Sequence, residues 1–205
     1  MADHPKHARV DHDILDVIRR RWSPRAFDPN ADISAAELHQ LFEAARWAPS
    51  SLNEQPWRFV VARARQSPDS FAALLGTLTP RNQEWARFAP VLVLTAVRLT
   101  VERSGHPNPH AWYDAGQAVA FLTLQATAAG VATRQMQGFD PAGARDVCQV
   151  PAAFEPAVVI AIGRVGDPER LAHEPHRTAE RQPRQRRPLT EFVFDGVWDR
   201  PLGGV

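Results

Sequence analysis

The pattern of apolar and polar residues predicts strands separated by helices. Apolar runs of strand length occupy 57–62, 90–97 and 157–163, and a shorter run occupies 131–136. The runs at 90–97 and 157–163 are apolar at nearly every position, which is typical of strands buried on both faces. Elsewhere, apolar residues recur at helical spacing, and these helical segments lie at 14–18, 38–45, 71–75 and 111–129.

Capping residues indicate where the helices begin. Ser34-Ala35-Ala36-Glu37 is a capping box, in which the serine and glutamate side chains satisfy each other's backbone amides. Asp11 is expected to cap a first helix that ends in three arginines, 19–21. Other helices are expected where a capping residue precedes a proline, at Ser67-Pro68, Thr79-Pro80 and Asp140-Pro141.

The segment 111–129 is the longest predicted helix and ends at Gly130. Its residues are apolar on nearly every side, which is typical of a buried helix. In a chain of this size, such a helix predicts either the centre of the core or an interface between subunits.

The stretch between the second helix and the first strand carries unusual chemistry. Pro49 ends the helix because proline disfavours helical backbone in the preceding residue. Hydroxyl and amide side chains follow before Pro56 and Trp57 open the strand, namely Ser50, Ser51, Asn53 and Gln55. These groups both donate and accept hydrogen bonds, so they suit a planar polar ligand. A polar turn held by its own serine and asparagine bonds is the alternative.

Composition bounds the class of protein. The 205 residues are 44% hydrophobic and 23% charged, which predicts one globular domain, 1–205. The formal net charge of +1 gives no general case for nucleic acid or an anionic membrane as a partner. The single cysteine, Cys148, excludes an internal disulfide and is expected to be buried and inert. Residues 1–13 lack the apolar run of a secretory signal, and no run is long enough to span a membrane, so a soluble cytoplasmic protein is expected.

Motifs for several other functions are absent from the sequence. It contains no Gly-x-Gly-x-x-Gly after a strand, no Walker loop and no Gly-x-Ser-x-Gly elbow. His106 and His110 lack ligands at metal-binding spacing, so no metal is expected. The Arg- and Pro-rich segment 164–187 is aperiodic and interrupted by glutamates, which predicts a disordered or solvated arm and not a nucleic-acid surface. The tail 192–198 is too apolar for a free end, so it is expected to pack on the core or on a partner subunit.

Two motifs resemble the flavin-dependent nitroreductase family. Residues 48–57 match Ala-Pro-Ser-Ser-x-Asn-x-Gln-Pro-Trp, and residues 20–27 resemble an N-terminal Arg-x-Ser-x-Arg-x-Phe motif. The motifs occur in the family's order and at about its spacing. The resemblance implies an α+β fold, with a central mixed, mostly antiparallel sheet flanked by helices. It also implies a homodimer with FMN at each interface.

The resemblance also implies which residues contact the cofactor. The first motif and an arginine pair near the C-terminus would hold the FMN phosphate, and a bend carrying two arginines and a serine suits a phosphate chemically. The second motif would reach the flavin from the opposite chain, and the segment that follows the predicted strand at 131–136 would present backbone groups to the isoalloxazine. These expected contacts are Arg21, Trp22, Ser23, Arg25, Pro49, Ser50, Ser51, Asn53, Gln137, Gly138, Arg186 and Arg187.

The implied activity is a ping-pong reaction in which NAD(P)H reduces FMN, and the reduced FMN then reduces a nitroaromatic, a quinone or a similar acceptor. FMN carries this chemistry, so no catalytic side chain is expected. A flavin-binding protein without turnover, for storage or sensing, is the alternative function. We hypothesise that four aromatic residues line the acceptor pocket: Trp85, Phe88, Trp112 and Tyr113. Packing in the core or in a lid is the alternative role for Trp85 and Phe88.

Overall fold

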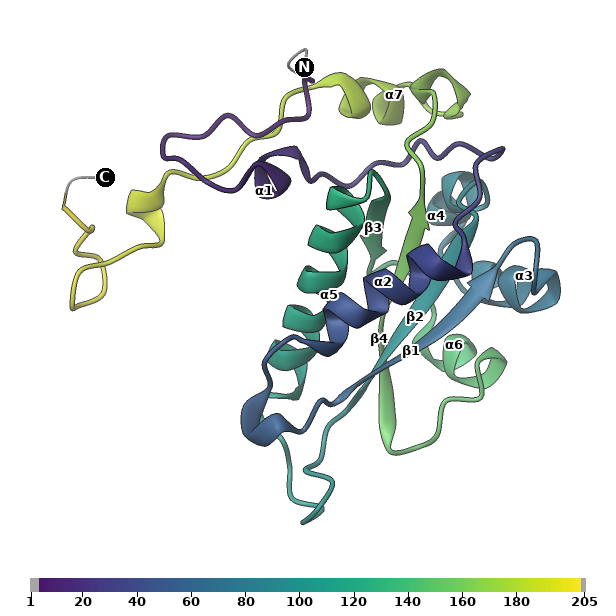
Figure 1. Ribbon diagram of the computed structural model, residues 1–205, viewed down its shortest axis with the longest axis horizontal. Helices are drawn as coiled ribbons and strands as arrows, with labels where there is room; N and C mark the ends of the chain where they lie inside the picture. The colour runs from purple at the N-terminus through teal and green to yellow at the C-terminus, as the bar shows by residue number, and fades with distance from the viewer. Residues whose placement is uncertain (1–3, 204–205) are drawn as a thin grey trace.

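The computed structural model describes residues 4–203, and Figure 1 shows the arrangement of its helices and strands. Short 3-10 turns lie at 51–53, 168–170 and 189–191. The helices and strands are α1 (Asp16–Arg20), α2 (Ala35–Arg46), β1 (Trp57–Arg63), α3 (Pro68–Gly76), α4 (Pro80–Ala86), β2 (Val91–Arg98), α5 (Ala111–Ala128), β3 (Ala132–Met136), α6 (Pro141–Val147), β4 (Phe154–Gly163) and α7 (Glu174–Arg181).

The four strands form one sheet in the order β1-β2-β4-β3, and each pairing is antiparallel. At its centre, Val93 of β2 lies opposite Val61 of β1 and Ile160 of β4. Every residue of β2 except its last is buried, as the continuous apolar run predicts. The predicted α+β fold with a mostly antiparallel sheet is therefore confirmed.

Helices cover both faces of this sheet (Figure 1). One face packs against α2 and α5, where Leu41 and Leu122 are fully buried. The other face packs against α3, α4 and α6, where Leu74 and Trp85 are buried. Burying an aliphatic side chain of this size stabilises the fold by roughly 1.5–3 kcal/mol. The long apolar helix is thus at the centre of one core layer, although part of its surface remains exposed.

Side-chain caps fix two of the helix starts where the sequence predicts them. The Ser34 hydroxyl accepts from the Glu37 amide at 3.2 Å, and the Glu37 carboxylate accepts from the Ser34 amide at 2.9 Å. Asp140 caps α6 by accepting from the amide of Ala142 at 3.1 Å. A cap of this kind contributes about 1 kcal/mol.

The prediction that Asp11 caps the first helix is wrong. Helix α1 begins at Asp16, its N-cap position is Leu15, and that residue makes no side-chain cap. Asp16 instead supplies the negative charge in the first turn, and its carboxylate accepts from Arg20 at 2.5 Å. The helix is therefore one short turn, held by local ion pairs and by its neighbours.

The prediction of a disordered or solvated arm over 164–187 is wrong in part, because the segment is ordered although most of its residues are exposed. Helix α7 lies within this segment, and its His176 and Glu180 are only 7% and 4% exposed. The contacts that hold it are polar: the Arg177 guanidinium, for example, donates to the carbonyl of Leu171 at 2.6 Å. Polar packing leaves no apolar periodicity in the sequence, which is why the pattern did not reveal this helix.

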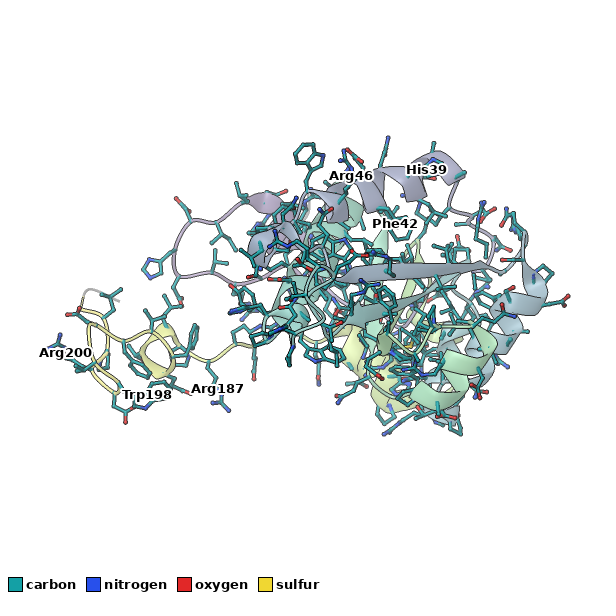
Figure 2. The ribbon with its side chains drawn as sticks, turned by 90° about the horizontal axis from the view of Figure 1, so that it is seen from below. His39, Phe42, Arg46, Arg187, Trp198 and Arg200 are labelled. Atoms are coloured by element: carbon teal, nitrogen blue, oxygen red, sulfur yellow. The ribbon has the colours of Figure 1, made fainter. Side chains whose placement is uncertain are left out.

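The two end segments of the described chain run beside each other near α1 and extend away from the body (Figure 1). Figure 2 shows Arg187, Trp198 and Arg200 on the extended C-terminal part, far from the α2 residues that it labels. In this part, the apolar side chains of Phe192 and Trp198 are 57% and 82% exposed. The tail therefore does not pack on its own core. Within residues 4–203, no helix combines the length and apolar character needed to cross a membrane.

Candidate functional site

The first motif lines a cavity of about 230 Å³ near the end of α1. Within it, the Arg21 guanidinium donates to the Ser23 hydroxyl at 3.2 Å. The chain folds back so that residues far apart in the sequence complete the wall. The lining residues are Lys6, Arg21, Trp22, Ser23, Arg25, Arg134, Ala179, Glu180, Arg184 and Arg186. Six of them are cationic, so the cavity has the chemistry of an anion site.

Three of these cations hold the backbone of the site. Arg184 donates to three carbonyls, those of Lys6 at 2.6 Å, Arg19 at 2.6 Å and Arg21 at 2.5 Å. Arg134 of β3 donates to the carbonyl of Ser23 at 2.5 Å. Lys6 donates its ammonium to the carbonyl of Ala179. These bonds tie the N-terminal segment, the first motif and the chain after α7 into one unit.

The remaining cations, Arg21, Arg25 and Arg186, line the same cavity. Burial lowers the pKa of Arg21, and the charge of Arg186 lowers it further. Burial likewise lowers the pKa of Arg25. Burial and the charge of Arg25 lower the pKa of Arg134 to about 10. All of these groups stay charged near neutral pH, so their mutual repulsion favours a bound anion.

Aromatic rings support the wall of this site. The Lys6 ammonium lies 5.5 Å from the centroid of the Trp22 ring, and the Arg134 guanidinium lies 5.3 Å from that of Trp85. Trp85 itself stacks on Phe27 and is only 1% exposed. Trp85 is therefore part of the core and cannot line an open acceptor pocket. This contradicts its part in the acceptor hypothesis. Phe88 is also packed against that core, whereas Trp112 and Tyr113 are 50% and 70% exposed.

The second motif forms a strained turn after α2. Three of its residues have positive φ angles, namely Leu52 at 53°, Asn53 at 57° and Gln55 at 45°. Left-handed backbone is unfavourable for residues other than glycine, and such strain clusters at functional sites. Pro49, Ser50, Ser51 and Asn53 are thus brought together on one short turn.

Several hydrogen bonds keep this turn in its strained form. The buried carboxylate of Asp114, in the first turn of α5, accepts from the Ser51 amide at 3.0 Å. The Ser50 hydroxyl accepts from the Gln55 amide at 3.0 Å, and the Asn53 side chain accepts from that of Gln55 at 3.1 Å. The polar-turn interpretation therefore accounts for part of the chemistry of Ser50 and Asn53.

Packing explains the glycine at position 138, in the segment after β3. The Gly138 carbonyl accepts from the Thr79 amide and from the Asn82 side chain, both at 3.0 Å. A Cβ atom at Gly138 would lie 2.8 Å from that Asn82 nitrogen. Close packing on the start of α4 thus favours glycine here, because a larger residue would displace the Asn82 side chain. Gln137 beside it is exposed, three residues along the chain from Arg134.

Both predicted arginines near the C-terminus lie beside the first motif, because Arg186 and Arg187 line an adjoining pocket of about 390 Å³ together with Arg21 and Arg184. Arg186 lines the cationic cavity together with Arg21, Ser23 and Arg25. Arg187 lies outside that cavity, its side chain is 82% exposed, and its nearest carboxylate is Glu191 at 3.8 Å. Sequence reasoning missed Lys6, Arg134 and Arg184. The arginine-rich run 184–187 was a signal for Arg184, whereas no motif contains Lys6 or Arg134.

The two motifs lie at opposite ends of α5 in one chain. The second motif bonds to Asp114 at the start of this helix. Trp22 of the first motif lines a pocket with Thr127 and Gly130 at its end. The thirteen residues from Asp114 to Thr127 span about 20 Å at 1.5 Å per residue. One chain therefore does not bring the two motifs onto the same small ligand.

Family membership follows from comparison with known proteins. A family model described as the Nitroreductase family matches residues 18–164, which is most of the chain and includes both motifs. The protein therefore belongs to the nitroreductase family.

Individual relatives agree with this assignment. A solved structure described as an oxidoreductase containing FMN matches with a TM-score of 0.86 and 29% identity, covering 94% of this chain and 96% of that one. An uncharacterized 15.4 kDa protein from Mycolicibacterium smegmatis is 34% identical over 155 residues, which is 71% of this chain and 99% of the relative. The major NAD(P)H-flavin oxidoreductase of Aliivibrio fischeri is 30% identical over 101 residues, which is 47% of this chain and 44% of the relative.

Proposed function

We propose that this protein transfers reducing equivalents from NAD(P)H to a nitroaromatic, a quinone or a similar small acceptor by a ping-pong mechanism. At the coarser level, it is an FMN-dependent NAD(P)H oxidoreductase of the nitroreductase family. The observation that carries the proposal is the cationic cavity of the first motif. Its crowded, partly buried guanidinium groups suit the phosphate of FMN in charge and in their hydrogen-bond donors.

FMN, when bound, supplies the redox chemistry by taking up hydride and passing electrons on. Arg21, Ser23, Arg25 and Arg186 would bind its phosphate, because they line the cavity and carry donors. Trp22 would close one wall. Arg187 lines an adjoining pocket with Arg21 and Arg186, so we keep it as a further proposed contact of the phosphate.

Gln137 and the backbone at Gly138 would hold the flavin ring, because they follow Arg134 of the cationic cavity by three and four residues, just past the end of β3. The chain would contribute orientation, hydrogen bonds and positive charge, with no side chain acting as acid or base.

A second copy of the chain would complete each site. The turn carrying Pro49, Ser50, Ser51 and Asn53 lies about 20 Å along α5 from the first motif, so the turn of the partner subunit would reach the flavin. Exposed apolar side chains support a homodimer: Trp47, Leu52 and Tyr113 are 68%, 75% and 70% exposed. The apolar tail would pack on the same partner.

The proposed acceptor pocket includes Trp112 and Tyr113. The two residues directly precede Asp114, whose carboxylate bonds the second motif. They therefore lie next to the turn that would contact the flavin. Trp112→Ala is expected to change the KM for aromatic acceptors, and unchanged steady-state kinetics for every acceptor would contradict its part in the pocket.

The direct test is the visible absorbance spectrum of the purified protein before and after anaerobic addition of NADH or NADPH. A yellow protein that bleaches supports the proposed reductase and identifies the donor. A yellow protein that does not bleach favours a flavin-binding protein without turnover. A colourless protein that takes up no added FMN refutes the proposal.

The phosphate assignment has its own test. Arg21→Ala and Arg25→Ala are each expected to weaken FMN binding by about 1.5–3 kcal/mol, the range for a hydrogen bond to a charged group. Titration of the apoprotein with FMN measures this loss. Unchanged affinity in both variants would exclude these two residues as phosphate ligands.

A further inference from the structure

A buried carboxylate is present inside the cationic cavity. Glu180 is in the last turn of α7, beyond the residues 18–164 that match the family model, and it is 4% exposed. It is the one carboxylate among the described residues that line the cavity. A negative charge repels an incoming phosphate, so a role other than phosphate binding must explain why Glu180 lies in this cavity.

The contacts of Glu180 supply that reason. Its two carboxylate oxygens accept from the backbone amide of Arg25, at 3.1 and 3.2 Å, and one of them accepts from the amide of Ala26 at 3.3 Å. Hydrogen bonds to an ionised acceptor are stronger than neutral ones. Breaking them would leave a buried amide or carboxylate without its partner.

The backbone of residues 26–28 is also bonded to the segment that follows β4. The Ala26 carbonyl accepts from the amide of Gly166 at 2.8 Å, and the Asp28 amide donates to the carbonyl of Arg164 at 3.0 Å. Glu180 thus closes a clamp around residues 25–28. The clamp fixes the point from which the Arg25 side chain enters the cavity.

Glu180 also moderates repulsion among the cations of the cavity. Its negative charge raises the pKa values of Arg25, Arg134 and Lys6, against the burial that lowers each of them. The group can therefore hold several cations together before an anion binds.

We propose that Glu180 is a positioning residue for phosphate recognition, which holds Arg25 in the orientation that contacts the FMN phosphate. This inference rests on the proposed function and adds a residue from outside the family match. The carboxylate has two opposing effects on phosphate affinity, because it positions Arg25 and repels the phosphate. We expect positioning to be the larger effect.

The experiment compares two ligands, FMN and riboflavin, which lacks the phosphate. Apoprotein is prepared from wild type, Glu180→Ala and Glu180→Gln, and each is titrated with both flavins by fluorescence. In Glu180→Ala, the preference for FMN over riboflavin is expected to fall about 10- to 100-fold, the equivalent of one charge-assisted hydrogen bond. Riboflavin affinity is expected to stay within about twofold, because a positioning role acts through the phosphate.

Glu180→Gln keeps the size of the side chain and one acceptor oxygen, so it is expected to lose less of the preference than alanine. It also remains informative if the alanine variant fails to fold. Glu169→Gln is the matched control, because Glu169 is an exposed glutamate near α7 that pairs with Arg181 outside the cavity. Thermal midpoints of all variants are measured alongside.

The possible outcomes of these titrations distinguish a positioning role of Glu180 from a purely structural one. An unchanged or increased FMN preference in both Glu180 variants overturns the positioning role, and an increase means that repulsion is the larger effect. Equal loss of FMN and riboflavin binding with a lowered thermal midpoint also overturns it, because the role is then only structural. A wild-type protein that binds FMN no better than riboflavin refutes the phosphate site of the proposed function itself.

Discussion

The amide of Ser51 donates to the carboxylate of Asp114 at 3.0 Å, across 63 residues of sequence. Asp114 is 2% exposed and lies in the first turn of α5, where a negative charge is favourable. This single bond connects the strained turn of the second motif to the longest helix of the core. It explains how residues with left-handed backbone are kept in place on the surface.

Removal of this bond should destabilise the protein and loosen the turn. Asp114→Ala leaves the Ser51 amide without its partner, and we expect a loss of about 1–3 kcal/mol in the free energy of unfolding. Asp114→Asn keeps an acceptor oxygen and should lose less. Urea denaturation measures both, and equal stability of the alanine variant and wild type would contradict the role given to Asp114.

The strain at Leu52 can be measured with a pair of substitutions. Leu52 is 75% exposed with φ 53°, so its side chain contributes little packing. Glycine adopts this backbone freely, whereas alanine does not. We expect Leu52→Gly to be more stable than Leu52→Ala by up to about 1 kcal/mol, the reverse of the order found in helices. The opposite order in denaturation experiments would show that the turn relaxes at little cost.

Arg184 should be irreplaceable by lysine. Its three donors reach three carbonyls, and an ammonium cannot reproduce that planar fork. Both Arg184→Lys and Arg184→Gln are expected to lower the free energy of unfolding by about 1.5–3 kcal/mol and to weaken FMN retention. Arg181→Gln, at an exposed pair with Glu169, is the control. Full retention of stability and FMN in Arg184→Lys would show that positive charge alone is sufficient.

Stability should fall as the pH drops below about 6.5, the usual pKa of histidine. Burial lowers the pKa of His176, with further contributions from Arg25, Arg81 and His173, whereas Glu84 opposes them. The folded state therefore binds this proton less readily than the unfolded state. Stability consequently rises with pH through the lowered pKa and levels off above 6.5.

The His176→Gln variant tests this assignment. Its unfolding free energy should depend less on pH between 5 and 7 than that of wild type, because one linked proton is removed. Urea denaturation at several pH values provides the comparison. Parallel curves for the two proteins would assign the acid sensitivity to other groups.

The exposed tail should contribute to self-association. Phe192→Ala combined with Trp198→Ala removes two large apolar side chains that are 57% and 82% exposed in the single chain. We expect this variant to dissociate at higher protein concentration than wild type in sedimentation experiments, because less apolar surface is buried between copies. Val147→Ala on α6, 45% exposed, is the control. An unchanged dissociation constant would place the tail outside the interface.

Local patterns in the sequence were sufficient for most of the fold. The apolar run at 90–97 predicted a strand covered on both faces, and the Ser34–Glu37 box predicted the start of a helix, because apolar patterns and capping motifs are local features of the sequence. The same locality explains why the two family motifs were recognisable. Each is a continuous segment whose backbone conformation depends mainly on its own residues.

Only the tertiary structure determined which distant groups meet. Lys6, Arg134, Glu180 and Arg184 come from three separate segments, the N-terminus, β3 and the end of α7 with the chain just after it, and they converge on the first motif. No short-range pattern marks Lys6, Arg134 or Glu180, because a hydrogen bond between a side chain and a distant backbone group has no sequence period. Helix α7 was missed for this reason. The sequence by itself determined the elements and the family, and the folded chain determined the geometry of the charged site.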